Sequence, residues 1–499
     1  MAQEIADQPT AWGIRSLNNL ELYAEARYLC GQYRCNAVTC RLGISQDFFS
    51  PAGTEVFRAN FLRAVHAVTF EHGILRATLR ENLALQSYWA AANDVNLSDH
   101  VEWLNYSVHA EDYEVILHSH REKLVDTEFT DTETQPGWRV TILSSQEVGV
   151  LDIIFTYTHT IADGKGGLVF IKSLLKHLQR DHPLPSNEIL LLPPSPHQLC
   201  DFPLTPGFVL STLWKELRPD IFRFSQNSHV GWLPTSAKAL PTRLKSFSIE
   251  SHSLEYILRC CRQNSTTLTG LVHALVFKSL ITLLSIDQAR AMTAVTTIDL
   301  RRFMPKNASN FPDFDPANTM GNFSSGMEHP FDENLVRQLR ELAKDPETNG
   351  LEQAIWSIAR RIRLEIEQKL SQGLSNDITG LMKFVSDWRA EASKKTARPR
   401  EHSWLISNLG VLSADGSESM TGGEGPHWHL QDATFSLSSE AVGAPFRISL
   451  LTVRGKALNI EISWQDGTPK EMAERILEDI QTFLLGLAAH EGVDVKTSA

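Results

Sequence analysis

Residues 149–167 read GVLDIIFTYTHTIADGKGG, and their pattern is the clearest indication of the fold. Its first part alternates with the period of a β-strand, which places every second side chain on one face. The apolar residues that share that face are Leu151, Ile153, Phe155 and Tyr157. His159 continues the same alternation. The pattern therefore predicts a strand that ends by presenting an imidazole.

The turn after this strand can fix that imidazole in place. Residues 159–164 are HTIADG, and residues 164–180 predict a glycine-containing loop followed by a helix. Gly164 lets the backbone turn sharply where a Cβ would clash. General-base catalysis needs a histidine with fixed geometry and a near-neutral pKa, and this arrangement provides the geometry for His159. A core histidine beside a helix-capping Asp163 is the structural alternative.

Further elements lie on both sides of this stretch. Hydrophobic periodicity predicts helices over residues 17–33, 54–72, 253–264 and 268–286 and from Pro469 onward, and strands over residues 244–250, 293–301, 448–453 and 457–464. Prolines crowd residues 181–241, where the periodicity fades, as is typical of a crossover. We therefore expect an α+β protein with one domain in residues 1–185 and a second in residues 241–499. A proline-rich linker over residues 186–240 would join them.

Length and composition exclude some classes of protein. A chain of 499 residues exceeds what one hydrophobic core usually holds, so two domains are expected. Its residues are 42% hydrophobic and 21% charged, which is ordinary for a globular protein. The net charge of -12 and the lack of a long basic block argue against nucleic acid as a partner. A small basic patch for cofactor phosphates is still compatible with this balance.

Targeting and metal signals are weak. The start, MAQEIADQPT, has neither a basic stretch nor an apolar core, so no signal peptide is expected. The apolar residues 268–286 include His273 and Lys278, which are costly in a membrane, and a buried core helix is the better interpretation. The six cysteines lack zinc or redox spacing, and His427-Trp428-His429 lacks a third ligand. We expect a cytoplasmic protein with no metal site and no membrane-spanning segment.

HTIADG resembles the HxxxDG signature of the CoA-dependent acyltransferase superfamily. That superfamily includes chloramphenicol acetyltransferase, the plant BAHD acyltransferases and peptide-synthetase condensation domains. Six other segments, in the family's order, resemble fungal alcohol O-acetyltransferases: LNNLELYAEARYLCGQYRCNAVTCRL (17–42), PGWRV (136–140), STTLTGLVHAL (265–275), TTIDLRRFMP (296–305), MGNFSSG (320–326) and ISNLG (406–410). The trichothecene O-acetyltransferases are similar in general plan. The plant DFGWG motif is absent, and SNLGVL at residues 407–412 takes the corresponding late position.

The resemblance implies a fold and a reaction. The fold would be two chloramphenicol-acetyltransferase-like domains with a tunnel between them, where acyl-CoA and a small-molecule alcohol meet at His159. His159 would deprotonate the hydroxyl, which attacks the thioester of acetyl-CoA or another acyl-CoA without a serine nucleophile. Acetyl-CoA would be a co-substrate, and no cofactor would be bound permanently. The acceptor would be an alcohol of the kind found in fungal secondary metabolism.

The resemblance also implies roles for other residues. Asp163 would form a structural ion pair with Arg301 rather than act in catalysis. Asn408, together with the backbone from Ser407 to Gly410, is the first candidate donor to the oxyanion of the tetrahedral intermediate.

Three further residues would lie near the tunnel. Asn322 is the second candidate oxyanion donor, although both asparagines could equally be ordinary loop residues. Thr269 and Gly270 could line the tunnel or simply begin a helix.

Two other functions stay open on the sequence. One is a binding or scaffold protein on the same fold, with His159 as a packed residue. The other is a condensation-type catalyst that forms an amide or ester from a carrier-bound thioester, although this chain contains no carrier region.

Overall fold

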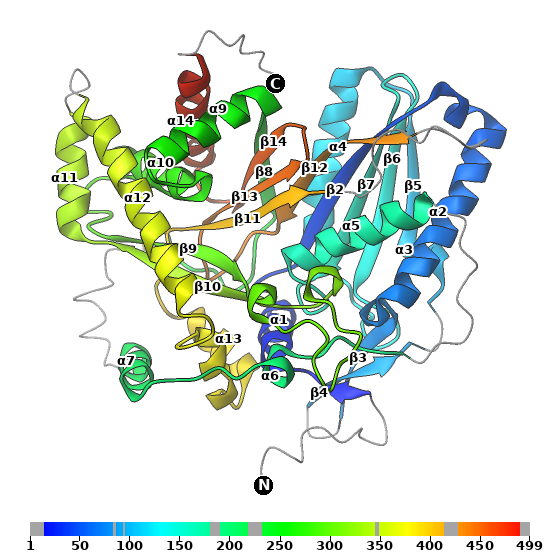
Figure 1. Cartoon of the computed structure of the whole chain (residues 1–499), viewed down its shortest axis with the longest axis horizontal. Coiled ribbons are helices and arrows are strands. Elements are labelled where there is room, and N and C mark those ends of the chain that lie inside the picture. Colours follow the sequence, from blue (N-terminus) through cyan, green and yellow to red (C-terminus); the bar gives the residue numbers. More distant parts are fainter. Residues whose placement is uncertain are drawn as a thin grey trace.

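The computed structural model describes residues 14–82, 86–92, 95–179, 190–217, 232–344, 349–413 and 428–489. Helices and strands are mixed along the chain and build two large sheets and one small sheet (Figure 1). The α+β class predicted from the sequence is confirmed.

The first large sheet carries the stretch quoted above. Its strand order is β12 (Trp428–Leu437), β2 (Cys35–Ile44), β7 (Val150–Thr158), β6 (Trp138–Ser145) and β5 (Val101–Tyr106). Strand β7 is central and buried along its length because apolar side chains of both parities are covered. Helices α2 (Pro51–Glu71) and α5 (Gly164–Leu178) pack on one face and α4 (Ala110–Val125) on the other (Figure 1). His159 therefore follows a rigid central strand.

The second large sheet has six strands. Their order is β10 (Ser324–Phe331), β9 (Met292–Asp299), β11 (Trp404–Leu412), β13 (Phe446–Val453), β14 (Leu458–Gln465) and β8 (Thr242–Ile249). The helices that pack with this sheet in one hydrophobic core are α9 (Ser251–Gln263), α10 (Leu268–Leu283), α11 (Glu333–Ala343), α12 (Gly350–Ser371) and α14 (Lys470–Ala489). Strands β13 and β14 pair antiparallel, and they confirm the strands predicted over residues 448–453 and 457–464.

Shorter elements complete the described part of the chain. A small sheet has the order β1 (Arg15–Ser16), β4 (Ser87–Ala91) and β3 (Ala77–Glu81). The remaining α-helices are α1 (Asn19–Leu29), α3 (Leu97–His100), α6 (Pro196–Leu199), α7 (Pro206–Leu217) and α13 (Trp388–Lys395). Short 3-10 turns η3 (Leu300–Phe303) and η4 (Pro316–Asn318) follow β9. They lead into the segment that meets His159.

Strand β12 crosses the domain division expected from the sequence. It comes from residues 428–437, yet it pairs antiparallel with β2 at the edge of the first sheet (Figure 1). It also contacts the second sheet, where the Asn459 side chain donates to the Ala433 carbonyl at 2.9 Å. The boundaries 1–185, 186–240 and 241–499 stay a prediction, but sheet membership does not follow them.

Helix α4 ties the first half of the chain to the edge strand β8. The Glu122 carboxylate accepts from the backbone N–H of Leu244 at 2.8 Å, and Asp126 accepts from that of Thr242 at 2.6 Å. Both N–H groups lie on a strand that is an edge of its sheet. Because an unpaired strand edge invites association, these carboxylates satisfy the edge and hold the two sheets together.

The described helices include no single membrane-spanning candidate. None of them alone is long and apolar enough to cross a bilayer, and only α9 and α10 pass that test as a pair, bent by 87°. Most of α10 is buried, and Lys278 forms an ion pair with Asp479 of α14 at 3.1 Å. This helix is the core helix that the sequence predicted.

Candidate active site

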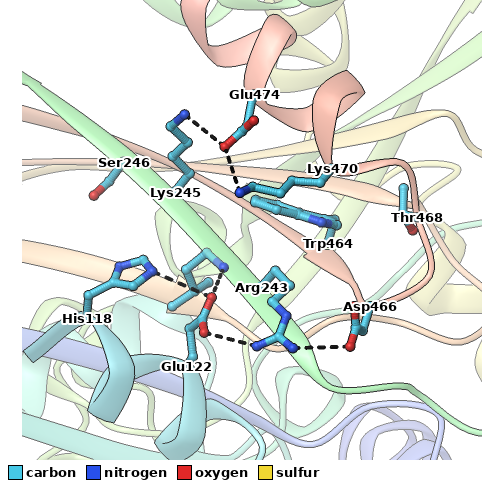
Figure 2. A pocket seen from close by; sticks show the side chains of 11 residues that line it. His118, Glu122, Arg243, Lys245, Ser246, Trp464, Asp466, Thr468, Lys470 and Glu474 are labelled. Atoms are coloured by element: carbon cyan, nitrogen blue, oxygen red, sulfur yellow. Dashed lines mark hydrogen bonds and ion pairs between the residues drawn. The ribbon is translucent and has the colours of Figure 1, made fainter. Parts of the chain in front are cut away.

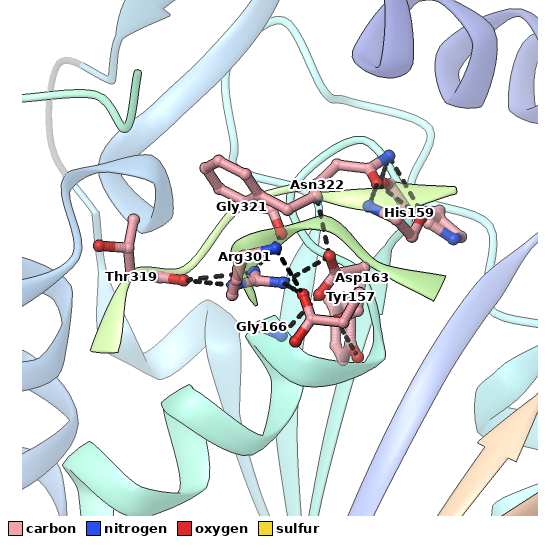
Figure 3. Close-up of polar contacts among 11 residues, drawn as sticks. Tyr157, His159, Asp163, Gly166, Arg301, Thr319, Gly321 and Asn322 are labelled. Atoms are coloured by element: carbon pink, nitrogen blue, oxygen red, sulfur yellow. Dashed lines mark hydrogen bonds and ion pairs between the residues drawn. The ribbon is translucent and has the colours of Figure 1, made fainter. Parts of the chain in front are cut away.

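His159 lies directly after β7, and Asn322 holds it there. His159 is a partly exposed residue, whereas its neighbours Thr158 and Thr160 are buried. Asn322 Nδ2 donates to the His159 carbonyl at 3.1 Å and lies 3.2 Å from Nδ1 of the ring (Figure 3). One side chain therefore constrains both the backbone and the ring of His159.

The surroundings of His159 keep the ring uncharged. Burial lowers the pKa of His159 to about 4, and the positive charges of Arg27 and Arg447 lower it further. A hydrogen bond to the residue's own carbonyl and the charge of Asp163 act in the opposite direction. At pH 7 the imidazole is therefore neutral and has one nitrogen lone pair available to accept a proton.

The tautomer of the neutral ring decides which of its nitrogens can accept a proton. A neutral imidazole carries one N–H, and its two nitrogens differ in role. When Nδ1 holds the hydrogen, it donates to the His159 carbonyl, which is the bond that raises the pKa. Nε2 then carries the free lone pair, and a general base acts through such a lone pair.

Asp163 uses its side chain within the scaffold. It is buried at the N-terminus of α5, and its carboxylate accepts from Arg301 Nη1 at 2.7 Å, Phe323 N at 2.7 Å and Gly166 N at 2.8 Å (Figure 3). Burial alone would raise the pKa of Asp163, but Arg301 and these donors hold it below its ordinary value. The carboxylate is therefore charged and fully engaged.

Arg301 connects Asp163 to the segment that carries Asn322. The guanidinium is buried and donates to the Gly321 carbonyl at 2.9 Å and to the Thr319 carbonyl at 3.3 Å. Asp163 N also donates to the Gly321 carbonyl at 3.2 Å. The ion pair thus clamps residues 319–323 against the HTIADG turn, which places Asn322 beside His159.

Gly164 is required for close packing rather than for an unusual backbone angle. Its φ does not lie in the left-handed region, so the sharp turn expected there is not the reason for glycine. A Cβ at this position would come within 2.7 Å of Leu409 Cδ2 and 2.9 Å of Phe435 Cζ. Strands β11 and β12 therefore approach the start of α5 closely.

Asn408 belongs to a second group of predicted residues. Its Nδ2 donates to Thr269 Oγ1 at 3.0 Å, and its Oδ1 accepts from Gly410 N at 2.8 Å. A bulge separates Asn408 from Gly410, whose φ of +72° suits glycine. Ser407 Oγ lies 3.3 Å from Thr297 Oγ1.

This group is joined to the HTIADG turn through Leu409. Lys165 Nζ donates to the Leu409 carbonyl at 2.5 Å, and the Leu409 side chain lies against Gly164. The structure thus brings Asn408, Thr269 and Gly410 together, while Asn322 alone among the predicted donors contacts His159 in the described part of the chain.

Gly270 lies where α10 crosses α12. A Cβ there would come within 2.5 Å of the Ala359 carbonyl oxygen. Its N–H donates to Thr267 Oγ1 at 3.2 Å, so Thr267 caps the helix. These contacts assign Gly270 to helix packing.

Three residues near His159 were missed on the sequence. The Tyr33 ring centroid lies 6.1 Å from that of His159, and Arg27 and Arg447 lie over the Tyr33 ring. Tyr33 and Arg27 are within the family-like segment 17–42, which was a usable signal. Arg447 lies in an ordinary-looking strand and offered none.

A cavity of about 460 Å³ lies elsewhere, between α4, β8 and α14 (Figure 2). Its charged side chains pair with one another, as in the bonds of Arg243 to Glu122 and Asp466 and of Lys245 to Glu474. It contains none of the predicted site residues. We therefore do not assign the chemistry to this cavity.

The described residues contain no cluster of metal ligands. Among the described residues, no three His, Cys, Asp or Glu side chains come together in a way that could hold a metal ion. His427 of the His427-Trp428-His429 group lies outside the described residues.

Comparisons with known proteins show which sequences this chain resembles. The family model described as alcohol acetyltransferase matches residues 122–484. A probable alcohol acetyltransferase of Fusarium pseudograminearum is 23% identical over 461 residues, covering 88% of this chain and 89% of the relative. A probable alcohol acetyltransferase of Aspergillus fumigatus is 22% identical over 362 residues, covering 68% of this chain and 70% of the relative.

Solved structures share the fold. The trichothecene 15-O-acetyltransferase of Fusarium sporotrichioides superposes with a TM-score of 0.67 at 16% identity, covering 95% of this chain and 94% of that chain. The first condensation domain of the CDA synthetase superposes with a TM-score of 0.54 at 14% identity, covering 97% and 98%. The chloramphenicol-acetyltransferase-like fold predicted from the HxxxDG resemblance is confirmed, whereas the tunnel stays a prediction.

Proposed function

The chain belongs to the alcohol acetyltransferase family, and from this premise we propose that it transfers an acetyl group from acetyl-CoA to the hydroxyl of a small molecule, with His159 as the general base. One observation carries the proposal. This observation is that His159, a partly exposed residue directly after β7, presents an uncharged imidazole that Asn322 holds in place.

The reaction needs one proton acceptor and no covalent enzyme intermediate. His159 Nε2 takes the hydroxyl proton as the alcohol oxygen attacks the thioester carbonyl carbon. The carbon–sulfur bond of the tetrahedral intermediate then breaks, and protonated His159 returns the proton to the departing thiolate. Holding both substrates together removes much of the entropic cost of a two-substrate reaction. The products are the ester and free CoA.

Other residues support this step. Asp163 and Arg301 hold the Asn322 segment and do not exchange protons in the reaction. We propose that Asn408 donates to the oxyanion, because its side-chain amide has two N–H groups and only one of them donates to Thr269 Oγ1. We further propose that a tunnel between the two halves admits acyl-CoA and the alcohol, that the acceptor is a secondary-metabolite type of alcohol, and that the protein acts in the cytoplasm.

A thiol-release assay tests the proposal. Purified protein would be incubated with acetyl-CoA and a panel of small alcohols, with ester formation followed by mass spectrometry. His159→Ala should lower kcat by about 100-fold to 10,000-fold, which is the usual contribution of general-base catalysis. His252→Ala is the matched control, since His252 is an exposed residue of α9.

Two outcomes would contradict the proposed function. If His159→Ala retains full activity in a folded protein, His159 is not the base. If the wild type releases thiol with none of the alcohols but forms an amide or ester from a carrier-bound thioester, the condensation-type function is correct instead. A protein that binds these ligands without turnover would support the scaffold alternative.

A further inference from the structure

Three side chains from separate elements form a stack beside His159. The guanidinium carbons of Arg27, from α1, and Arg447, from β13, lie 4.9 Å and 4.5 Å from the centroid of the Tyr33 ring. The Tyr33 ring is in turn 6.1 Å from the His159 ring, at an interplanar angle of 59°. The Tyr33 hydroxyl donates to the Asn36 side chain, which fixes the ring. The stack is therefore rigid.

The stack carries an excess of positive charge. Glu440 forms an ion pair with Arg27 and lies 3.7 Å from Arg447 Nη1. Arg400 adds a third guanidinium, bonded to the carbonyls of Glu440 and Gly443. Three arginines and one glutamate leave two positive charges among these four residues. The exposed fraction of the side chain is only 12% for Arg27, 9% for Glu440 and 7% for Arg447.

Burying this net positive charge costs free energy. Removing charged groups from water requires compensation by partners, and here the single carboxylate is shared. The Nε atoms of Arg27 and Arg447 are buried and make no hydrogen bond. Uncompensated charge next to a reactive group is characteristic of functional sites.

We propose that Arg27 and Arg447, stacked on Tyr33, form a cationic clamp that adds to the effect of burial in keeping the imidazole of His159 neutral. This rests on the proposed role of His159 as the base. A positive neighbour disfavours a second proton on the ring. The clamp therefore preserves the proton-accepting form when the medium becomes acidic.

Asp163 acts against the clamp, because its negative charge raises the pKa of His159. The Asp163 carboxylate is neutralised by Arg301 at 2.7 Å. Tyr157, on β7, is buried, and its hydroxyl donates to the Asp163 carbonyl at 3.0 Å. Asn322 is uncharged. Arg27 from α1 and Arg447 from β13 are the two positive charges that lower the pKa of His159.

Histidine titration by NMR tests the clamp directly. Protein labelled with ¹³C at the histidine Cε1 would be titrated, and the His159 signal assigned by its loss in His159→Gln. Arg27→Met and Arg447→Met should each raise the pKa of His159 by about one pH unit, because one nearby positive charge is removed. Glu440→Gln should shift it in the opposite direction. Arg337→Met, an exposed arginine of α11, is the matched control and should change nothing.

The acid limb of kcat/KM against pH should move with the titration. Thermal unfolding would show which variants are folded, and Arg27→Gln, which keeps a hydrogen-bond donor for Glu440, serves if a methionine variant unfolds. An unchanged His159 titration in the folded arginine variants overturns the proposal, as does a shift of the same sign in the arginine and Glu440 variants. Since the titration requires no turnover, its result stands even if the acetyl transfer fails.

Discussion

At the scale of single residues, Asn322 determines how His159 presents its ring. Its amide contacts both the carbonyl and Nδ1 of His159, at 3.1 Å and 3.2 Å. Its Oδ1 accepts from the Ser324 hydroxyl at 3.0 Å, which fixes the orientation of the amide. We therefore regard Asn322 as a positioning residue, because it acts on the substrates only through His159.

Asn322→Ala tests that role. We expect kcat to fall by about 10-fold to 100-fold with little change in KM, because the base is misaligned while the substrates still bind. Steady-state kinetics with acetyl-CoA and the preferred alcohol would measure both constants. Asn318→Ala, an exposed asparagine shortly before in the chain, is the control. A raised KM at constant kcat would instead mean that Asn322 binds a substrate.

At the scale of elements, the ion pair between Asp163 and Arg301 joins the start of α5 to residues 319–323. Asp163→Asn leaves the buried Arg301 guanidinium with only the more exposed Asp299 as a carboxylate partner, and we expect the free energy of unfolding to fall by about 3–5 kcal/mol. Urea unfolding of the single variants and of Asp163→Asn with Arg301→Met would give the coupling. The double variant should lose less than the sum of the singles.

A surface pair provides the comparison for that measurement. Asp287 and Arg290 lie 3.8 Å apart with most of the Asp287 side chain exposed, so Asp287→Asn should cost less than about 1 kcal/mol. Equal losses in the buried and exposed pairs would mean that the Asp163 pair does not clamp the segment.

A buried hydrogen-bond chain links α10, β9, β10 and α12. The Trp404 indole donates to His273 Nδ1 at 2.9 Å, so the hydrogen of His273 resides on Nε2 and points to Thr296 Oγ1 at 2.8 Å. The Thr296 hydroxyl then donates to His329 Nε2 at 2.8 Å, and His329 Nδ1 donates to Glu365 at 2.6 Å. These donor and acceptor roles require a neutral His273, because a protonated ring could not accept from Trp404 at Nδ1. Burial lowers the pKa of His273 well below its ordinary value.

At the scale of the whole molecule, buried neutral histidines make stability depend on pH. Burial lowers the pKa of His72 from 6.5 to about 4. Between these values the unfolded chain binds more protons than the folded protein, so stability falls as the pH falls. His72 alone should account for about 3 kcal/mol between pH 7 and pH 4.

Urea unfolding at pH 7, 5.5 and 4.5 would measure this loss. His72→Gln removes the titrating group while keeping a polar side chain near Ser173, to which His72 bonds at 2.8 Å. The dependence on pH should therefore be shallower in this variant. A flat profile in the wild type would contradict the prediction, because it would show that the pKa values of the buried histidines do not differ between the folded protein and the unfolded chain.

Local pattern and distant contacts differ in what a sequence can predict. The strand before His159, the helix after it and the core helix containing His273 were predictable because their periodicity is local. Asn322 lies 163 positions from His159, and nothing near either residue encodes their contact. The same is true of Arg447 and Tyr33. No strand was predicted over residues 428–437, and the pattern of a strand does not determine which strand it pairs with.

Strand β12 comes from late in the chain but pairs with β2 near its start, so the order of synthesis on the ribosome affects how the first sheet forms. Until residues 428–437 emerge, β2 has an open edge, and a nascent chain in that state offers unpaired backbone to other chains. The first sheet can close only late in translation. A gene fragment encoding only the residues before Trp428 should therefore yield inclusion bodies, and co-expression of the missing C-terminal piece should restore soluble material.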